Sequence, residues 1–90
     1  MNYKYKLKFL PVALKEWDKL DHSIKEQFKR KLSERLNDPC VASCRLHGFE
    51  NYYKIKLKSA GYRLVYEVSE NEMSVIVIAV NRRDKVYKKL

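Results

Sequence analysis

Basic side chains recur at every second position in the middle of the chain. Lys54, Lys56 and Lys58 alternate with apolar residues, and this period places the three ammonium groups on one face of a β-strand. Arg63 follows after a short turn-like segment and can return to the same face. Crowded cations lower one another's proton affinity, so a lysine in such a cluster can lose its proton and become a usable base. The cluster could therefore hold a polyanion and also move a proton.

RNA fits this chemistry because it carries its own nucleophile. Attack of a ribose 2′-OH on the neighbouring phosphate needs a base at the 2′-OH, charge stabilisation at the phosphorane and a proton for the leaving 5′-oxygen. Tyrosines among the cations suit bases that stack on aromatic rings. Binding alone would use the same side chains, so spacing alone favours RNA binding over cleavage.

Other kinds of site find little support in the sequence. It has no Ser/His/Asp set at a persuasive spacing, no glycine-rich phosphate loop and no paired carboxylates near the cations. Cys40 and Cys44 have only His47 nearby, which is too few ligands for a zinc site. We therefore expect reduced thiols, no metal and no cofactor, with His22 on the surface and His47 in a structural position.

The overall charge points to the same partners. The 90 residues include 20 Lys and Arg against 11 Asp and Glu, a formal net charge of +9. Polyanions such as RNA, DNA or a ribosome surface are the natural partners, ahead of an anionic membrane or a merely solvated basic surface. No window approaches the roughly 18 apolar residues of a membrane span, and the start lacks a signal-peptide core. A single cytoplasmic domain over residues 1–90 is expected.

The first elements can be read from changes of period. Alternation over residues 3–9 predicts a strand, and Pro11 ends it and opens a helix over residues 11–20. One face of that strand is expected to be buried through Tyr3, Tyr5, Leu7 and Phe9.

A longer second helix is expected after a capping box. Ser23 and Glu26 have the spacing of such a box, apolar residues recur every four positions to Leu36, and Asn37-Asp38-Pro39 ends the helix. Its other face carries Lys29 and Arg30, which could touch phosphates, although a charged helix face is more often simply solvated.

Three or four further strands complete the pattern. A short strand is possible at residues 45–47, and two longer ones form a hairpin around a turn at residues 59–62. Placing Lys58 opposite Arg63 keeps the apolar side chains on one face, whereas Lys58 opposite Tyr62 would bury Arg63. The Val/Ile-rich run 73–80 suits a central strand covered on both faces.

Together these elements predict an α+β fold. An antiparallel sheet of about four strands is covered on one face by a helical hairpin. The opposite face is left open, and the hairpin cations project from it. Arg82 and Arg83 leave the end of the last long strand close by.

At this level of detail the sequence resembles a known family. The run YKIKLKSAGYRLVY, which starts at Tyr53, closely resembles the central hairpin of the bacterial RelE toxins. The similarity extends to ALKEW near the N-terminus, to LHG before the hairpin and to the apolar last strand. It covers nearly the whole chain.

The resemblance implies an activity and partners. RelE toxins enter the ribosomal A site and cut the mRNA there, and a cognate antitoxin, RelB, holds them inactive. This chain would then be the toxin of a type II toxin–antitoxin system and a metal-independent, ribosome-dependent endoribonuclease. Its partners would be the 70S ribosome, mRNA and a RelB-like antitoxin, with operator DNA bound only through the antitoxin complex.

The family's acting residues fall on five positions here. By similarity, Arg63 would stabilise the phosphorane and Arg83 would serve the leaving oxygen. Lys56 or Tyr87 would help to activate the 2′-OH, with Tyr87 also stacking on a base, and which group is the base stays open. The catalytic set implied in this way is Lys54, Lys56, Arg63, Arg83 and Tyr87.

The resemblance weakens after the last strand. The segment between Arg83 and Tyr87 is slightly shorter than in RelE, no clear final helix is expected, and Arg82 is the alternative match for Arg83. Around the site, contacts to RNA or the ribosome are expected from Lys58, Arg82, Lys29 and Arg30.

Two other functions stay open. ParE-type members share the fold but inhibit gyrase, and they would not be expected to keep this set of basic residues and tyrosine. A non-catalytic nucleic-acid-binding module would use the same positive surface. A related branch that cuts with a glutamate and a C-terminal histidine is disfavoured, because no histidine follows His47.

Overall fold

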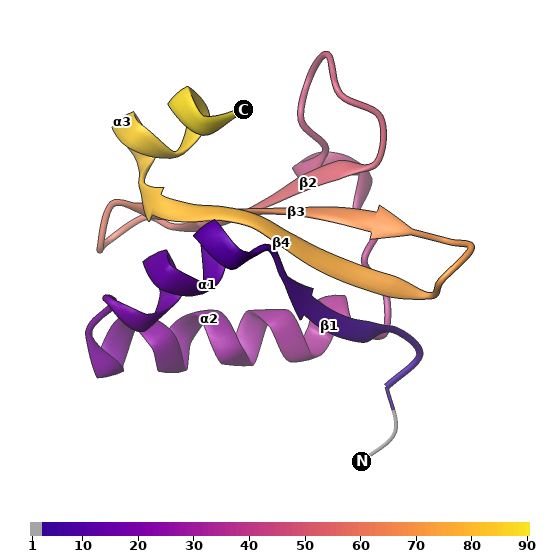
Figure 1. Cartoon of the computed structure of the whole chain (residues 1–90), viewed down its shortest axis with the longest axis horizontal. Coiled ribbons are helices and arrows are strands. Elements are labelled where there is room, and N and C mark those ends of the chain that lie inside the picture. Colours follow the sequence, from indigo (N-terminus) through magenta and orange to yellow (C-terminus); the bar gives the residue numbers. More distant parts are fainter. Residues whose placement is uncertain (1–2) are drawn as a thin grey trace.

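A four-stranded sheet lies between two layers of helix in the computed structural model, which describes residues 3–90. Helices α1 and α2 lie on one side of the sheet and the short C-terminal helices on the other (Figure 1). Met1 and Asn2, which belong to the start of the chain that is expected to lack a signal-peptide core, lie outside the described residues. The elements in chain order are β1 (Lys6–Phe9), α1 (Pro11–Asp18), α2 (His22–Arg35), η1 (Ala42–Cys44), β2 (Tyr52–Leu57), β3 (Tyr62–Ser69), β4 (Ser74–Arg82), α3 (Arg83–Val86) and η2 (Tyr87–Lys89).

The last strand of the sequence lies inside the sheet. The strand order is β1-β4-β3-β2, and β2, β3 and β4 pair antiparallel as predicted. β1, however, pairs parallel to β4, so the sheet is mixed. The two strands are joined by the whole stretch from α1 to β3 and not by a hairpin, which is what a parallel pair requires.

The helical hairpin covers one face of the sheet, as the apolar periodicity predicts. Ala13 on α1 and Ile24, Phe28 and Leu32 on α2 are buried. They pack in one cluster with side chains from one face of the strands. The sheet side of this core includes Ile55, Leu64, Tyr66, Val75 and Val77. No helix within residues 3–90 is long and apolar enough to cross a bilayer.

The first strand is shorter and less buried than predicted. β1 begins at Lys6, and although Tyr5 and Phe9 pack against the core, Tyr3 and Leu7 are 40% and 39% exposed. β1 is an edge strand, so its apolar face is covered only in part. Alternation alone does not distinguish an edge strand from a covered one.

Both helices differ from their predicted bounds. α1 ends at Asp18. α2 begins at His22, with Asp21 as its N-cap and no side-chain cap hydrogen bond, so the predicted capping box does not form. Glu26 instead lies 3.4 Å from the Lys29 ammonium. His22 is exposed at the start of the helix, as expected for a surface residue.

The connector after α2 holds little regular structure. The strand considered at residues 45–47 is reduced to one bridge between Arg45 and Tyr53. His47 is exposed and not packed in a structural position, which corrects the prediction. Cys40 and Cys44 are free thiols.

The central hairpin has the predicted faces but a different register. Leu57 pairs with Tyr62 and Lys56 pairs with Arg63, so the turn contains residues 58–61 and the predicted pairing of Lys58 with Arg63 is wrong by two positions. A shift of two keeps every side chain on its face, because side chains alternate with a period of two. Gly61 adopts a φ of 71°, which suits a residue without a Cβ.

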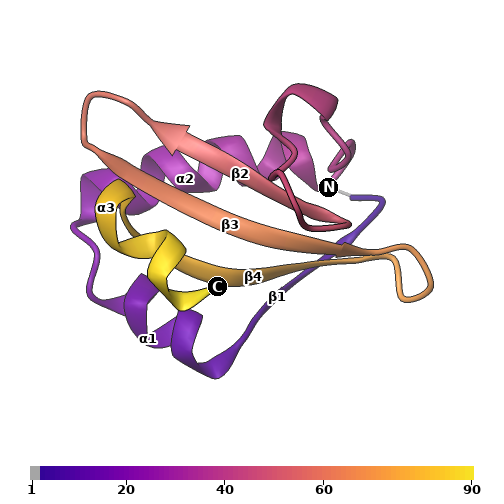
Figure 2. The same ribbon diagram turned by 90° about the horizontal axis from the view of Figure 1, so that it is seen from above.

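The face predicted to be open is covered in part by the C-terminus. Contrary to expectation, the chain ends in α3 and η2, which lie over β3 and β4 in the view of Figure 2. Val86 is fully buried there in a second apolar cluster with Val65, Ala79 and Leu46. This cluster explains why the central strand β4 is apolar on both faces.

A buried phenol joins α2 to the sheet. Tyr66 Oη donates to Pro39 O at 2.6 Å and accepts from Arg35 Nη1 at 2.8 Å. Burial raises the pKa of Tyr66 to about 12, so the hydroxyl stays protonated and can donate at neutral pH.

We expect Tyr66→Phe to lower the free energy of unfolding by about 1–3 kcal/mol, because Pro39 O and the Arg35 guanidinium each lose a partner in a half-buried setting. Urea unfolding checks this, with Tyr3→Phe as the matched control, since the Tyr3 side chain is 40% exposed. Equal stability of the two variants would contradict the role of the phenol.

Candidate active site

The hairpin cations meet on the sheet face opposite α1 and α2. Lys54 and Lys56 alternate along β2 with Ile55 and Leu57, which are buried in the helix-covered core. Arg63 is the direct cross-strand neighbour of Lys56, so their side chains project from the same face. Three of the five predicted catalytic residues are thus adjacent.

A hollow of about 240 Å³ lies beside this cluster. It opens at the end of the hairpin, where the turn meets the start of α3. Among the described residues its lining holds two lysines and two arginines but no carboxylate: Lys56, Leu57, Lys58, Gly61, Tyr62, Arg63 and Arg83. A phosphate group would be the complementary ligand.

Of the two consecutive arginines, Arg83 is the one that lines the hollow in the described part of the chain. Its backbone N–H donates to Gly61 O at 2.9 Å, which fastens the start of α3 to the hairpin turn. Arg82 ends β4 as an exposed residue, and its N–H donates to Asn81 Oδ1 at 2.8 Å. The geometry therefore favours Arg83 over Arg82 as the second arginine of the site.

Tyr87 joins the cluster despite the shortened C-terminal segment. Arg63 Nη1 donates to Tyr87 Oη at 2.6 Å, and the guanidinium carbon lies 5.4 Å from the centre of the tyrosine ring. The residue is held in place because Val86 beside it is buried against the sheet. The phenol, the guanidinium and the hairpin lysines thus lie on one surface.

Electrostatic repulsion alters the acidity of one lysine. The positive charges of Lys54 and Arg63, with a smaller contribution from Lys58, lower the pKa of the Lys56 ammonium. Neighbouring cations destabilise the charged form of an amine. Lys56 is therefore the lysine of the cluster that the geometry favours as a proton acceptor.

Two of the predicted RNA-binding residues lie elsewhere. Lys29 and Arg30 are exposed on α2, across the sheet from the hairpin cations (Figure 1). Lys58 lies in the hairpin turn and lines the hollow. The structure thus groups Lys58 with the site and leaves the α2 cations outside it.

One contact to the site has no signal in the sequence. Arg35 Nη1 donates to Lys54 O at 3.3 Å and so ties the end of α2 to the strand that carries the cluster. Helical periodicity assigns Arg35 only to a charged face.

In the described chain no group of three or more His, Cys, Asp and Glu gathers into a potential metal site.

The sequence matches one described family over most of its length. Residues 7–87 match the ParE toxin of type II toxin-antitoxin system, parDE. Over 81 residues the chain is 47% identical to the mRNA interferase toxin RelE of Escherichia coli (strain K12), covering 90% of this chain and 85% of that protein. The chain belongs to the RelE family of toxins. The mRNA interferase RelE of Shigella flexneri is similar to the same extent, at 47% identity over 81 residues.

This RelE family toxin shares its fold with crystal structures of the E. coli toxin. The match to the isolated E. coli RelE toxin has a TM-score of 0.86 at 46% identity, and it covers 94% of this chain and 93% of that toxin. The toxin of the intact E. coli RelBE toxin–antitoxin complex has a TM-score of 0.85 at 47% identity, with coverages of 87% and 95%. The predicted family and the α+β fold are confirmed.

Proposed function

We propose that this RelE family toxin is a metal-independent endoribonuclease that cuts mRNA in the A site of the translating ribosome. The observation that carries the proposal is the contact of Arg63 with Tyr87 beside Lys56, which gathers cationic and proton-transfer groups on one open surface. The relatives named as mRNA interferases support the same chemistry.

The proposed reaction uses the ribose 2′-OH as nucleophile. The 2′-oxygen loses its proton to a base and attacks the adjacent phosphorus, and the bond from phosphorus to the 5′-oxygen then breaks. The products are a 2′,3′-cyclic phosphate and a 5′-hydroxyl end. The protein supplies the base, one cation for the phosphorane and a second cation that stabilises the leaving 5′-oxygen, which takes its proton from water in the open site.

Roles follow from position and charge. Lys56 in its neutral form is the base, because its neighbours favour loss of the ammonium proton. Arg63 stabilises the phosphorane with its fork of donors, and Arg83 at the other side of the hollow serves the leaving oxygen. Tyr87, held by Arg63, stacks its ring on a nucleobase of the mRNA. Lys54 adds positive charge to the site.

The pH dependence of cleavage tests the role of Lys56. Removing the charge of Lys54 in Lys54→Gln raises the pKa of Lys56 toward its ordinary value, so the rise of kcat with pH should move to higher pH. Lys58→Gln is the matched control and should move it less, because Lys58 contributes less to the lowered pKa. Identical profiles for both variants and the parent would remove Lys56 from the role of base.

Partners follow from the family. A RelB-like antitoxin is the proposed inhibitor, since solved relatives include a RelBE complex and a complex with an antitoxin peptide. The net charge of +9 suits the ribosome and mRNA as further partners. Operator DNA would be bound only through the antitoxin complex, and the site of action would be the cytoplasm.

The deciding experiment is primer extension on a defined mRNA in a reconstituted translation system without added nuclease. Purified toxin should produce cuts confined to A-site codons, and these cuts should vanish when ribosomes are omitted. Metal independence predicts that toxin treated with a chelator, before it is mixed with intact ribosomes that carry mRNA, cuts as fast as untreated toxin. Cuts in naked RNA would contradict ribosome dependence.

Inhibition of gyrase is the second candidate function, because the matching family is described as the ParE toxin of type II toxin-antitoxin system, parDE, and ParE-type toxins inhibit gyrase. A folded toxin that leaves the mRNA intact but blocks supercoiling of a relaxed plasmid by purified gyrase would favour this candidate. The cluster of Lys56, Arg63 and Tyr87 would then have no catalytic role.

A further inference from the structure

An exposed aromatic stack lies at the far end of β2 from the hairpin turn. The rings of Phe49 and Tyr52 are 5.1 Å apart and only 14° from parallel. Phe49 is nevertheless 39% exposed, so it stacks on Tyr52 with part of its ring still in water. A large apolar ring in that position is a platform on which a further flat group can stack.

The loop that carries Phe49 is anchored on both sides. Leu46 is buried, and its N–H donates to Tyr52 O at 2.9 Å. Asn51 O accepts from Val68 N, also at 2.9 Å. The turn uses left-handed backbone at Gly48 and Asn51, with φ values of 81° and 63°. The platform is thus held by the sheet.

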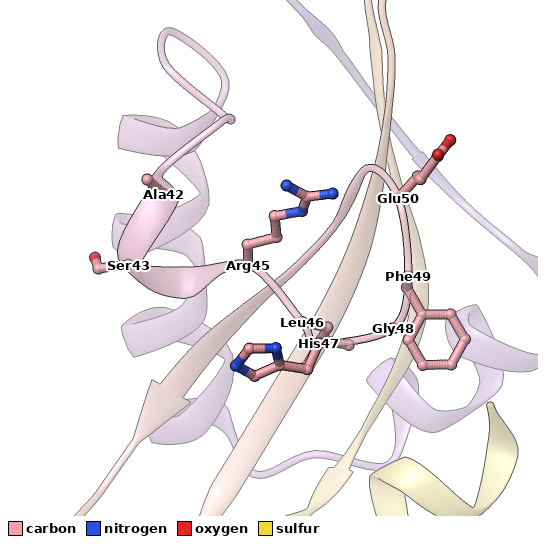
Figure 3. A pocket seen from close by; sticks show the side chains of 8 residues that line it. All are labelled: Ala42, Ser43, Arg45, Leu46, His47, Gly48, Phe49 and Glu50. Carbon is pink, nitrogen blue, oxygen red and sulfur yellow. The ribbon is translucent and has the colours of Figure 1, made fainter.

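A guanidinium and an imidazole flank the platform. Arg45 and His47 are exposed on the same loop, and with Phe49 they line an open hollow of about 620 Å³. Figure 3 shows His47 and Phe49 projecting to the two sides of Gly48, while the carboxylate of Glu50 points away from both. A ring beside a guanidinium and an imidazole suits a nucleotide, whose base stacks on the ring and whose phosphate accepts hydrogen bonds from the two side chains.

The platform is continuous with the candidate active site. Tyr52 belongs to the apolar cluster that holds Val86 and Tyr87. It also precedes Lys54 by two residues on β2, which places the two side chains on the same face about 7 Å apart along the strand. A single strand of RNA lying over Lys56 and Lys54 would next meet Tyr52 and Phe49.

We propose that Phe49, stacked on Tyr52, binds a base of the mRNA a few nucleotides from the cut, with Arg45 and His47 on its phosphates. This inference rests on the proposed function and adds a second stacking position to it, at the opposite end of β2 from the Arg63 cluster. A base on the ribosome's own RNA, or a protein partner, are the other possible occupants, and the experiment below separates them.

The first measurement is cleavage kinetics on programmed ribosomes. Phe49→Ala should raise the KM about 5- to 150-fold, the range expected for loss of one stacked base, while kcat changes little. Phe49→Tyr should restore the KM, since it keeps the ring. Val12→Ala is the matched control, because Val12 is an exposed apolar side chain on α1 at 58% exposure. An unchanged KM in Phe49→Ala would overturn the proposal.

The second measurement does not depend on cleavage. Ribosomes programmed with an mRNA that carries 2′-O-methyl groups and one 2-aminopurine are titrated with purified toxin, the probe base being moved along the mRNA. Fluorescence should be quenched most at one position, and this extra quenching should vanish in Phe49→Ala and return in Phe49→Tyr. A raised KM without position-specific quenching would overturn the assignment to mRNA and place the occupant on the ribosome. Specific quenching, together with no cleavage of unmodified mRNA by the same toxin on programmed ribosomes, would leave the platform standing and refute the proposed nuclease.

Discussion

Arg63→Ala is expected to lower the rate of mRNA cleavage by about 10³-fold, the upper range for loss of one preorganised donor to a developing anion. The change removes the guanidinium from the phosphorane and also removes the donor that holds Tyr87 Oη at 2.6 Å. Single-turnover cleavage on programmed ribosomes measures the loss. Retention of full activity would eliminate the proposed site.

Two controls separate chemistry from folding in this experiment. Arg63 is only partly buried, so its replacement should leave the unfolding midpoint nearly unchanged. Tyr87→Phe keeps the ring and removes only the hydroxyl, and it should cost less than Arg63→Ala. If Arg63 acts in part through Tyr87, the double variant should lose less activity than the two single losses combined predict.

Arg83→Ala is expected to lower kcat by about 10²-fold, because Arg83 lines the hollow on the side away from β2 and would stabilise charge on the leaving oxygen. Arg82→Ala is the matched control, since the two residues are adjacent and carry the same charge. It should raise the KM through lost attraction to RNA while kcat stays close to that of the parent. A larger fall in kcat for Arg82→Ala than for Arg83→Ala would reverse the assignment.

Much of the fold follows from local patterns. Alternation assigned Lys54, Lys56 and Arg63 to one face correctly. A side chain moves to the other face only when the strand register shifts by an odd number of residues. The same argument could not distinguish registers two residues apart, and the observed pairing of Lys56 with Arg63 is one of them. Turn geometry decides between such registers, and a run such as Lys58-Ser59-Ala60-Gly61 does not specify one turn uniquely.

Features that depend on distant parts of the chain were not predictable in this way. The direction of β1 relative to β4 depends on the path between them, not on the residues of either strand. The terminal helix α3 has four residues, too few for a helical period to be recognised. It is stabilised by burial of Val86 on the sheet, a contact that only the assembled sheet creates.

The candidate site, like the fold, has features that the sequence predicts and contacts that only the folded chain shows. The resemblance supplied the identities of its residues, and the structure places five of them on one hairpin and on the terminal helices α3 and η2. The contacts of Arg63 with Tyr87 and of Arg35 with Lys54 O span 24 and 19 positions. No spacing rule connects residues so far apart, so these contacts were accessible only from the folded chain.

The order of the elements along the chain also bears on which parts of such a toxin's sequence can change independently. Every group of the proposed catalytic site lies between Lys54 and Tyr87, whereas α1 and α2 come earlier and, apart from Arg35, meet the sheet from its other side. Mutations at well-separated positions generally act independently. The outer surface of the two long helices can therefore change in sequence while the chemistry encoded by the second half of the gene stays under separate selection.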